Sequence, residues 1–339
     1  MIDKNAPVWL GGANVLRGVL MGGADVIPGV SGGTVALILG IYDRLVAALS
    51  RFDLTLLGHV RNGRWTAAAR RIDLAFLATL LCGIALGIFG LGGLMNGLLT
   101  TAQTRPFALS AFFGMILASS LLVLRMIPVR SRGDVIVSAL LWLGGVAFAY
   151  WLTGLQTGDV DSTYGYVFIC GLVAICAMIL PGISGAYLLL IMGLYIHLTD
   201  ILKRLPRLNV TGEDLVTVIV FAGGCAIGLI AFSKALHRLL ASHRRQTMSI
   251  LCGFMFGAIH NIWPFQQDLT PAVAEFKHKQ FRNIMPDTLD GHVIGCVAIA
   301  LTALGLVLLL DRWTNGHEKR PLAEAQPQPA QGGSVGNRH

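Results

Sequence analysis

The feature that most constrains this chain is a Pro-Gly break inside apolar sequence that occurs twice. The first copy reads IPGVSGGTVALILGIY over residues 27–42, and the second reads LPGISGAYLLLIMGLY over residues 180–195. Proline and glycine interrupt helices, and lipid tolerates the freed backbone groups only where protein buries them or where they line a cavity. The duplication therefore indicates a membrane protein with two related halves, in which each break handles something polar.

The composition also indicates an integral membrane protein. Hydrophobic residues make up 54% of the chain and charged residues only 13%, against roughly 25% charged residues in a soluble domain. The net charge of +8 comes from short basic clusters between apolar spans, which indicate membrane orientation rather than nucleic-acid binding. The pairs Gly83/Gly87 and Gly224/Gly228 have the small-xxx-small spacing of closely packed membrane helices.

The cysteines give no indication of a disulfide framework or a metal site. All six lie within apolar segments, and none forms a Cys-x-x-Cys pair or lies near a suitable histidine cluster. We therefore expect no metal and no cofactor. The first residues also lack the organisation of a secretory signal, so membrane insertion is expected to depend on the later spans.

Apolar segments alternate with polar connections along most of the chain. A spanning helix needs about 20 residues, and the segments beside the two breaks are mostly shorter than that. The pattern predicts an all-α polytopic protein with two broken helical hairpins and six crossings. The hairpins are predicted at 8–50 and 164–202, and the crossings at 72–99, 106–124, 134–153, 214–236, 247–263 and 291–311.

Lysine and arginine counts test this arrangement. Basic residues are concentrated in 51–71, 125–132 and 238–245, which predicts that these three segments are cytoplasmic. Segment 156–161, which has no positive charge, is expected outside. The exception is a short basic group on the predicted outer side, Lys203, Arg204 and Arg207.

Each half would then contain one hairpin and three crossings, and an odd number of crossings inserts the second half upside down. We predict a first repeat over 1–133 that is completed by the crossing 134–153, and a second repeat over 154–311. Such inverted repeats with interrupted helices are typical of secondary transporters, which hold substrate near the midplane. Residues 312–339 are predicted to form a disordered cytoplasmic tail, and no role is predicted for the outer loop 264–290.

The chemistry of the breaks favours an anion. Helices that resume after them present backbone N–H groups and positive dipole ends, and glycine lets a ligand such as phosphate approach closely. Hydroxyls of Ser31, Thr34 and Ser184 are expected to add donors, while the alternative is that they only cap their own helices. The predicted binding residues at the two breaks are Pro28, Gly29, Ser31, Gly32, Gly33, Thr34, Pro181, Gly182, Ser184 and Gly185.

Two charges precede the first break within apolar sequence, where a lone ion is costly and is usually paired or functional. Arg17 is a predicted phosphate counter-ion, and Asp25 is predicted to carry a coupling proton or to fix an arginine. The equivalent positions of the second half are Cys170 and Met178. A structural Arg17–Asp25 pair is the alternative, but the eight positions between them span about 12 Å on a straight helix. Coupling to a proton or a sodium gradient stays open.

The run GGADVIPGVSGGT from Gly22 to Thr34, together with the second Pro-Gly-x-Ser-Gly break at 181–185, resembles the bacterial polyprenyl-phosphate transporter family. The resemblance covers nearly the whole membrane portion. It implies a protein that returns undecaprenyl phosphate, the carrier lipid of cell-wall synthesis, from the outer to the inner leaflet of the cytoplasmic membrane. The second hairpin has Ala186-Tyr187 in place of Gly33-Thr34, which predicts fewer phosphate donors there.

Two other function classes are alternatives to a lipid transporter. A channel or transporter for a small soluble anion would use the same glycine-rich helix starts, and sequence does not distinguish it. A membrane phosphatase would need a Ser-Gly-His motif with a distant histidine. Gly33 and Ala186 stand where that first histidine would be, so we expect no enzyme.

Overall fold

A computed structural model describes residues 9–25, 31–155, 163–204, 209–270, 279, 281–286 and 288–318. In these ranges the chain is mostly helical and has one antiparallel pair of strands, β1 (Gln266–Asp268) and β2 (Phe281–Asn283). The helices are α1 (Trp9–Asp25), α2 (Gly32–Ile38), α3 (Tyr42–Ser50), α4 (Leu54–Arg61), α5 (Trp65–Arg71), α6 (Leu74–Thr100), α7 (Arg105–Met126), α8 (Arg132–Thr153), α9 (Tyr164–Ile179), α10 (Gly185–Ile191), α11 (Leu194–Arg204), α12 (Gly212–Ser242), α13 (Arg244–Ala258), the 3-10 helix η2 (Ile259–Ile262) and α14 (Gly291–Glu318). The predicted polytopic helical architecture is confirmed at this level.

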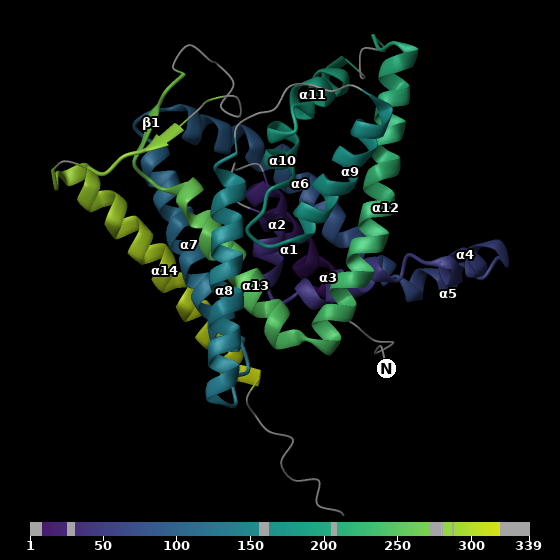
Figure 1. Cartoon of the computed structure of the whole chain (residues 1–339), viewed down its shortest axis with the longest axis horizontal. Coiled ribbons are helices and arrows are strands. Elements are labelled where there is room, and N and C mark those ends of the chain that lie inside the picture. Colours follow the sequence, from purple (N-terminus) through teal and green to yellow (C-terminus); the bar gives the residue numbers. More distant parts are fainter. Residues whose placement is uncertain are drawn as a thin grey trace, which may run out of the picture.

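Among the described residues, five helices are long and apolar enough to cross a membrane, namely α6, α7, α8, α12 and α14. They correspond to five of the six predicted crossings. The sixth prediction, 247–263, corresponds to α13, which alone has 15 residues and reaches the length of a span only together with η2, which has four. In Figure 1 the long helices α7, α8, α12 and α14 stand around the shorter α1, α2 and α10, which are gathered in the middle.

The second arm of each hairpin is sharply bent. Helices α2 and α3 meet at 119°, and α10 and α11 meet at 114°. The second arm of each predicted hairpin therefore consists of two short helices, a division that the apolar pattern did not predict. Gly40 (φ +68°) and Gly193 (φ +76°) adopt the left-handed conformation that ends a helix and that glycine enters without steric cost.

Small residues let the helices pack closely in four principal pairs, α1 with α6, α9 with α12, α7 with α14 and α8 with α13. A methyl group added to Gly83 would overlap the carbonyl oxygen of Val15 on α1. One added to Gly224 would likewise overlap the carbonyl oxygen of Phe168 on α9. The small-xxx-small glycines thus lie in the predicted kind of interface. In each half that interface joins the first hairpin helix, α1 or α9, to the first long helix after the hairpin, α6 or α12.

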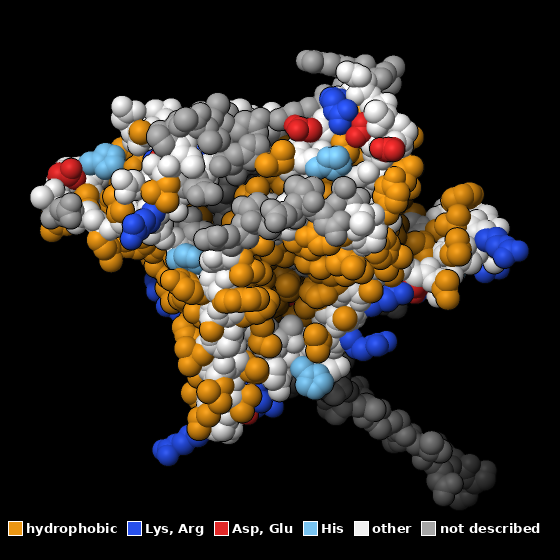
Figure 2. All heavy atoms as spheres, turned by 45° about the horizontal axis from the view of Figure 1, so that its top comes forward, with side chains coloured by type: hydrophobic (Ala, Val, Ile, Leu, Met, Phe, Trp, Pro, Cys, Tyr) orange, Lys and Arg blue, Asp and Glu red, His pale blue; other side chains and the backbone are white. Residues whose placement is uncertain are grey.

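Ion pairs join helix starts that lie beside two of the predicted cytoplasmic segments, 125–132 and 238–245. Arg245 at the start of α13 pairs with Asp134 at the start of α8. The neighbouring Arg244 pairs with Asp43 at the start of α3, with 2.8 Å between Nη2 and Oδ2. The flanks of the molecule are apolar, and Figure 2 shows orange side chains running along them.

Several connections have more structure than predicted. Segment 51–71, predicted to be cytoplasmic, contains α4 and α5, which extend away from the other helices in Figure 1, and segment 264–290, predicted to be an outer loop, contains β1 and β2. The tail predicted from residue 312 begins later, because α14 continues to Glu318. The remaining predicted tail, 319–339, lies outside the described residues. Arg204, one of the basic residues that did not fit the topology, donates two hydrogen bonds to Asp214, at 3.0 and 3.2 Å.

Candidate functional site

The two hairpins meet where their second arms begin. The Gly182 N–H of the second hairpin donates to Thr34 Oγ1 of the first at 2.9 Å. Ser31 Oγ donates to the Leu180 carbonyl at 3.3 Å, so two hydroxyls of the first hairpin bind backbone of the second. Ser31 is 3% exposed and Thr34 is 1% exposed. Residues separated by about half the chain therefore form one buried polar contact in an apolar interior.

Glycines make this approach tight enough for hydrogen bonding. A methyl group on Gly33 would lie 3.0 Å from the Ile179 carbonyl oxygen, which leaves little room for a side chain between the hairpins. Gly182 has φ +83°, and a methyl group there would lie 2.8 Å from the Met255 backbone nitrogen. The second hairpin tip is thus wedged between the first hairpin and α13.

Asp25 binds the start of α2 across the first break. Its Oδ1 accepts a hydrogen bond from the Gly32 N–H at 2.6 Å. A negative charge at a helix N-terminus is favourable, because it complements unpaired N–H groups and the helix dipole. The next N–H, that of Gly33, donates to Ser31 Oγ at 3.2 Å. The protein's own groups therefore occupy, in this conformation, the donors at which the sequence predicted phosphate.

The second hairpin has the same geometry with different chemistry. Ser184 Oγ accepts from the Tyr187 N–H at 3.4 Å and caps α10, as Ser31 caps α2. A methyl group on Gly185 would lie 2.5 Å from Met178 Cγ, whereas one on Gly32 would lie 2.6 Å from Asp25 Oδ2. Met178 thus lies over its hairpin glycine as Asp25 lies over Gly32.

The structure does not bring Arg17 to the hairpin contact. Arg17 is half-buried on α1, and its Nη1 donates to Asn14 Oδ1 at 2.9 Å. In the described part of the chain no carboxylate pairs with Arg17, so the alternative Arg17–Asp25 pair is not formed. Pro28 and Gly29 lie outside the described residues, while the other predicted binding residues of the two breaks lie at or beside the contact.

Sequence reasoning missed Arg105, because the predicted crossing began one residue later at 106. Arg105 is only 8% exposed at the start of α7, and its Cζ lies 4.6 Å from the centroid of the Phe281 ring. Asp268 on the neighbouring strand is held by Lys279 Nζ at 2.6 Å, and this hydrogen bond lowers the pKa of that carboxyl. An arginine directly before a proline at the start of an apolar run was the available signal.

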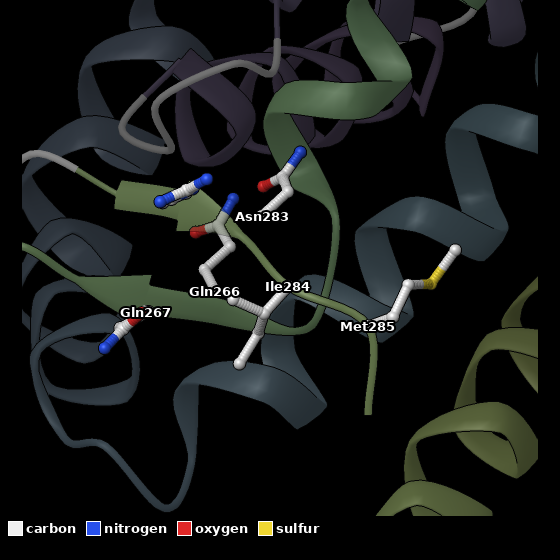
Figure 3. Close-up of a pocket in the computed structure, with 6 residues that line it drawn as sticks. Gln266, Gln267, Asn283, Ile284 and Met285 are labelled. Carbon is white, nitrogen blue, oxygen red and sulfur yellow. The ribbon is translucent and has the colours of Figure 1, made fainter. Parts of the chain in front are cut away.

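Metal coordination finds no support in the described ranges, where no group of three or more His, Cys, Asp or Glu side chains could hold an ion. An open hollow of about 700 Å³ lies over strands β1 and β2. Figure 3 shows Gln266 and Asn283, which are paired across the sheet, extending to the same side, with Gln267 directed away from them. The hollow is lined by Gln266, Gln267, Arg282, Asn283, Ile284 and Met285.

Comparison with known proteins gives a consistent result. The profile of the VCA0040-like, undecaprenyl phosphate translocase-like family matches residues 21–280. A polyprenyl-phosphate transporter of Vibrio cholerae is 38% identical over 284 residues, which cover 80% of this chain and 87% of the relative. A polyprenyl-phosphate transporter of Staphylococcus aureus is 29% identical over 198 residues, or 56% of this chain and 68% of the relative. No solved structure gives a significant match.

Proposed function

Because this chain belongs to the undecaprenyl phosphate translocase-like family, we propose that it moves undecaprenyl phosphate from the outer to the inner leaflet of the bacterial cytoplasmic membrane. The lipid would thereby return to cell-wall synthesis. Translocation changes no covalent bond, so the proposal assigns no catalytic residue and no cofactor. The substrate headgroup is a phosphate monoester, and the polyprenyl chain can remain in lipid throughout.

The observation that carries the proposal is the buried contact between the hairpin tips. Moving an unshielded phosphate through hydrocarbon is very costly, so a translocase must replace the water shell with fixed polar groups. The Thr34–Gly182 and Ser31–Leu180 hydrogen bonds bring such groups from both halves to one place among apolar helices. We propose that the headgroup passes at this contact and that the two bonds break and re-form as the hairpins move.

The proposed arrangement of the halves is an inverted repeat. Its support is the pairing of equivalent helices: α1 packs on α6 as α9 packs on α12, and α7 packs on α14 as α13 packs on α8. Interrupted helices between such repeats surround the substrate site of many secondary transporters, near the bilayer midplane. Rocking of one half against the other would then expose the hairpin contact to each leaflet in turn.

Asp25 would compete with the substrate in this mechanism. Its carboxylate holds the Gly32 N–H at 2.6 Å, and a phosphate at the first hairpin would need that donor. We propose that protonation of Asp25 weakens its hold on Gly32 and so couples headgroup binding to a proton gradient, with sodium as the alternative coupling ion. Arg17, about two turns back along α1, would then serve as counter-ion on the cytoplasmic side of the contact.

The test is headgroup accessibility of a fluorescent polyprenyl phosphate in proteoliposomes, with uptake of inorganic phosphate followed in parallel. Protein-dependent movement of the lipid, without phosphate uptake or release, is the expected result. Uptake of soluble phosphate with the lipid immobile would make the protein an anion transporter instead. Release of phosphate from the lipid would make it an enzyme. Either of these two results would overturn the proposal.

The coupling role of Asp25 is tested in the same vesicles with Asp25→Asn. Asparagine keeps an oxygen acceptor for the Gly32 N–H but carries no charge and does not titrate between pH 5 and 8. We expect the wild-type lipid transport rate to depend on an imposed pH gradient and the Asp25→Asn rate to be independent of it. A variant that keeps the full gradient dependence would show that the proton is carried elsewhere.

A further inference from the structure

Arg105 is a buried cation whose role the packing does not explain. The residue is 8% exposed, yet in the described part of the chain no carboxylate lies within ion-pair distance of its guanidinium and no acceptor takes a hydrogen bond from it. Its contact is the face of the Phe281 ring, 4.6 Å from Cζ to the ring centroid. The nearby Asp268 carboxylate acts on Arg105 only at longer range and is already paired with Lys279.

The position makes this arrangement more costly. Arg105 is the first residue of α7, where the helix dipole places partial positive charge and a cation is disfavoured. Arg105 keeps only a small exposed area, and removing most of an arginine side chain from water without a hydrogen-bonded anion is also unfavourable, since one cation–π contact returns only about 0.5–2 kcal/mol. A bound anion would remove both penalties, because it would pair with the guanidinium and its negative charge would offset the positive end of the helix dipole.

The location fits the path of the proposed substrate. Leu109, one turn after Arg105, packs in a buried cluster with Ala24, the neighbour of Asp25, and against Val35 of α2. Arg125 lies at the other end of α7, toward the ion-paired cytoplasmic end, so Arg105 is on the opposite, outer side of the molecule. Arg105 therefore lies between the outer surface and the first hairpin.

We propose that Arg105 forms a receiving site for a phosphate monoester on the outer side, from which the headgroup passes to the hairpin contact. The inference rests on the proposed function and adds a residue to its site. The planar guanidinium can bind two phosphate oxygens at once, while the ring of Phe281, on β2, packs against it and holds it in place. Lipid phosphate and free phosphate share this chemistry, and the test separates them.

The experiment measures binding of a short-chain fluorescent polyprenyl monophosphate to the full chain in nanodiscs. Polyprenol serves as the uncharged ligand, and inorganic phosphate serves as competitor. The variants are Arg105→Gln, Arg105→Lys and Arg125→Gln, the last being a matched charge loss at the exposed far end of the same helix. Loss of charge-assisted hydrogen bonds predicts about 10- to 100-fold weaker lipid-phosphate binding in Arg105→Gln. Arg105→Lys should be intermediate, because it keeps the charge and loses the paired geometry.

Wild-type affinity in Arg105→Gln would overturn this inference and leave the proposed function standing. An equal loss in Arg125→Gln would also overturn it, because the effect would then follow net charge. Inorganic phosphate that binds at Arg105 while polyprenyl phosphate does not compete for it would assign the site to free phosphate. If the wild type binds polyprenol as tightly as polyprenyl phosphate, the proposed function itself is overturned. If Arg105→Gln is poorly folded, Arg105→Lys takes its place. Weaker lipid-phosphate binding in Arg105→Lys would support the inference, and wild-type affinity would overturn it.

Discussion

Replacing Thr34 by valine tests the contact between the hairpins directly. Valine has nearly the shape of threonine, so at this 1% exposed site it fills the same space and removes only the hydroxyl. The Gly182 N–H, now 2.9 Å from Oγ1, would then face a methyl group. Leaving a buried donor unpaired costs about 1–3 kcal/mol. The Ser31–Leu180 hydrogen bond, at 3.3 Å, is longer and therefore offsets little of this cost.

The assay is amide hydrogen exchange of the peptide that contains Gly182, measured with the protein in nanodiscs. At about 1.4 kcal/mol per factor of ten, the lost bond predicts roughly 5- to 150-fold faster exchange of this amide. Thr34→Ser is the matched control, because serine keeps the hydroxyl and should preserve most of the protection. Unchanged protection of Gly182 in Thr34→Val would refute the conclusion that this hydrogen bond ties the two halves together.

Two further predictions concern packing and surface charge. Gly83→Ala should lower the melting temperature in detergent despite alanine's higher helix propensity, because the methyl overlaps the Val15 carbonyl. Gly90→Ala on the same helix faces open space and should be neutral or stabilising, so equal effects would contradict the packing explanation. The hydrogen bond from Arg71 lowers the pKa of Asp53 from 3.8 to about 2, so its contribution to stability is present above pH 3.8 and is lost as the pH falls toward 2. In Arg71→Gln the Asp53 pKa, followed by NMR titration, should return toward 3.8, and a value that stays near 2 would contradict this cause.

Local patterns predicted the features that depend on neighbours in sequence. The breaks and the close-packing glycines both follow from spacing and composition. The bends at Gly40 and Gly193 had the same kind of signal, since both glycines recur at one place in the duplicated run. The predicted hairpins did not include these bends, because a glycine in the left-handed conformation can end a helix without a change in polarity.

The contacts that define the site could not be predicted from the sequence. The Thr34–Gly182 bond joins residues 148 positions apart, and no spacing rule connects them. The bond from the Gly32 N–H to Asp25 depends on the path of the chain through the break, because Asp25 belongs to the preceding helix. Arg105 was left at the edge of an apolar run, where an arginine is usually solvated; only the packing of Phe281 against it shows that it is buried.

The two hairpins are alike in geometry and unlike in charge, and this difference limits how the halves can share the work. In each hairpin the residue seven positions before the helix glycine lies over that glycine, Asp25 over Gly32 and Met178 over Gly185. Only the first hairpin can exchange its own carboxylate for a bound anion, because the Met178 thioether carries no charge and accepts hydrogen bonds weakly. Gly182 meanwhile fixes the second tip against the backbone of α13. It follows that the first hairpin would bind and release a headgroup at the contact while the second hairpin stays comparatively fixed. The two hairpins would not hold the headgroup symmetrically.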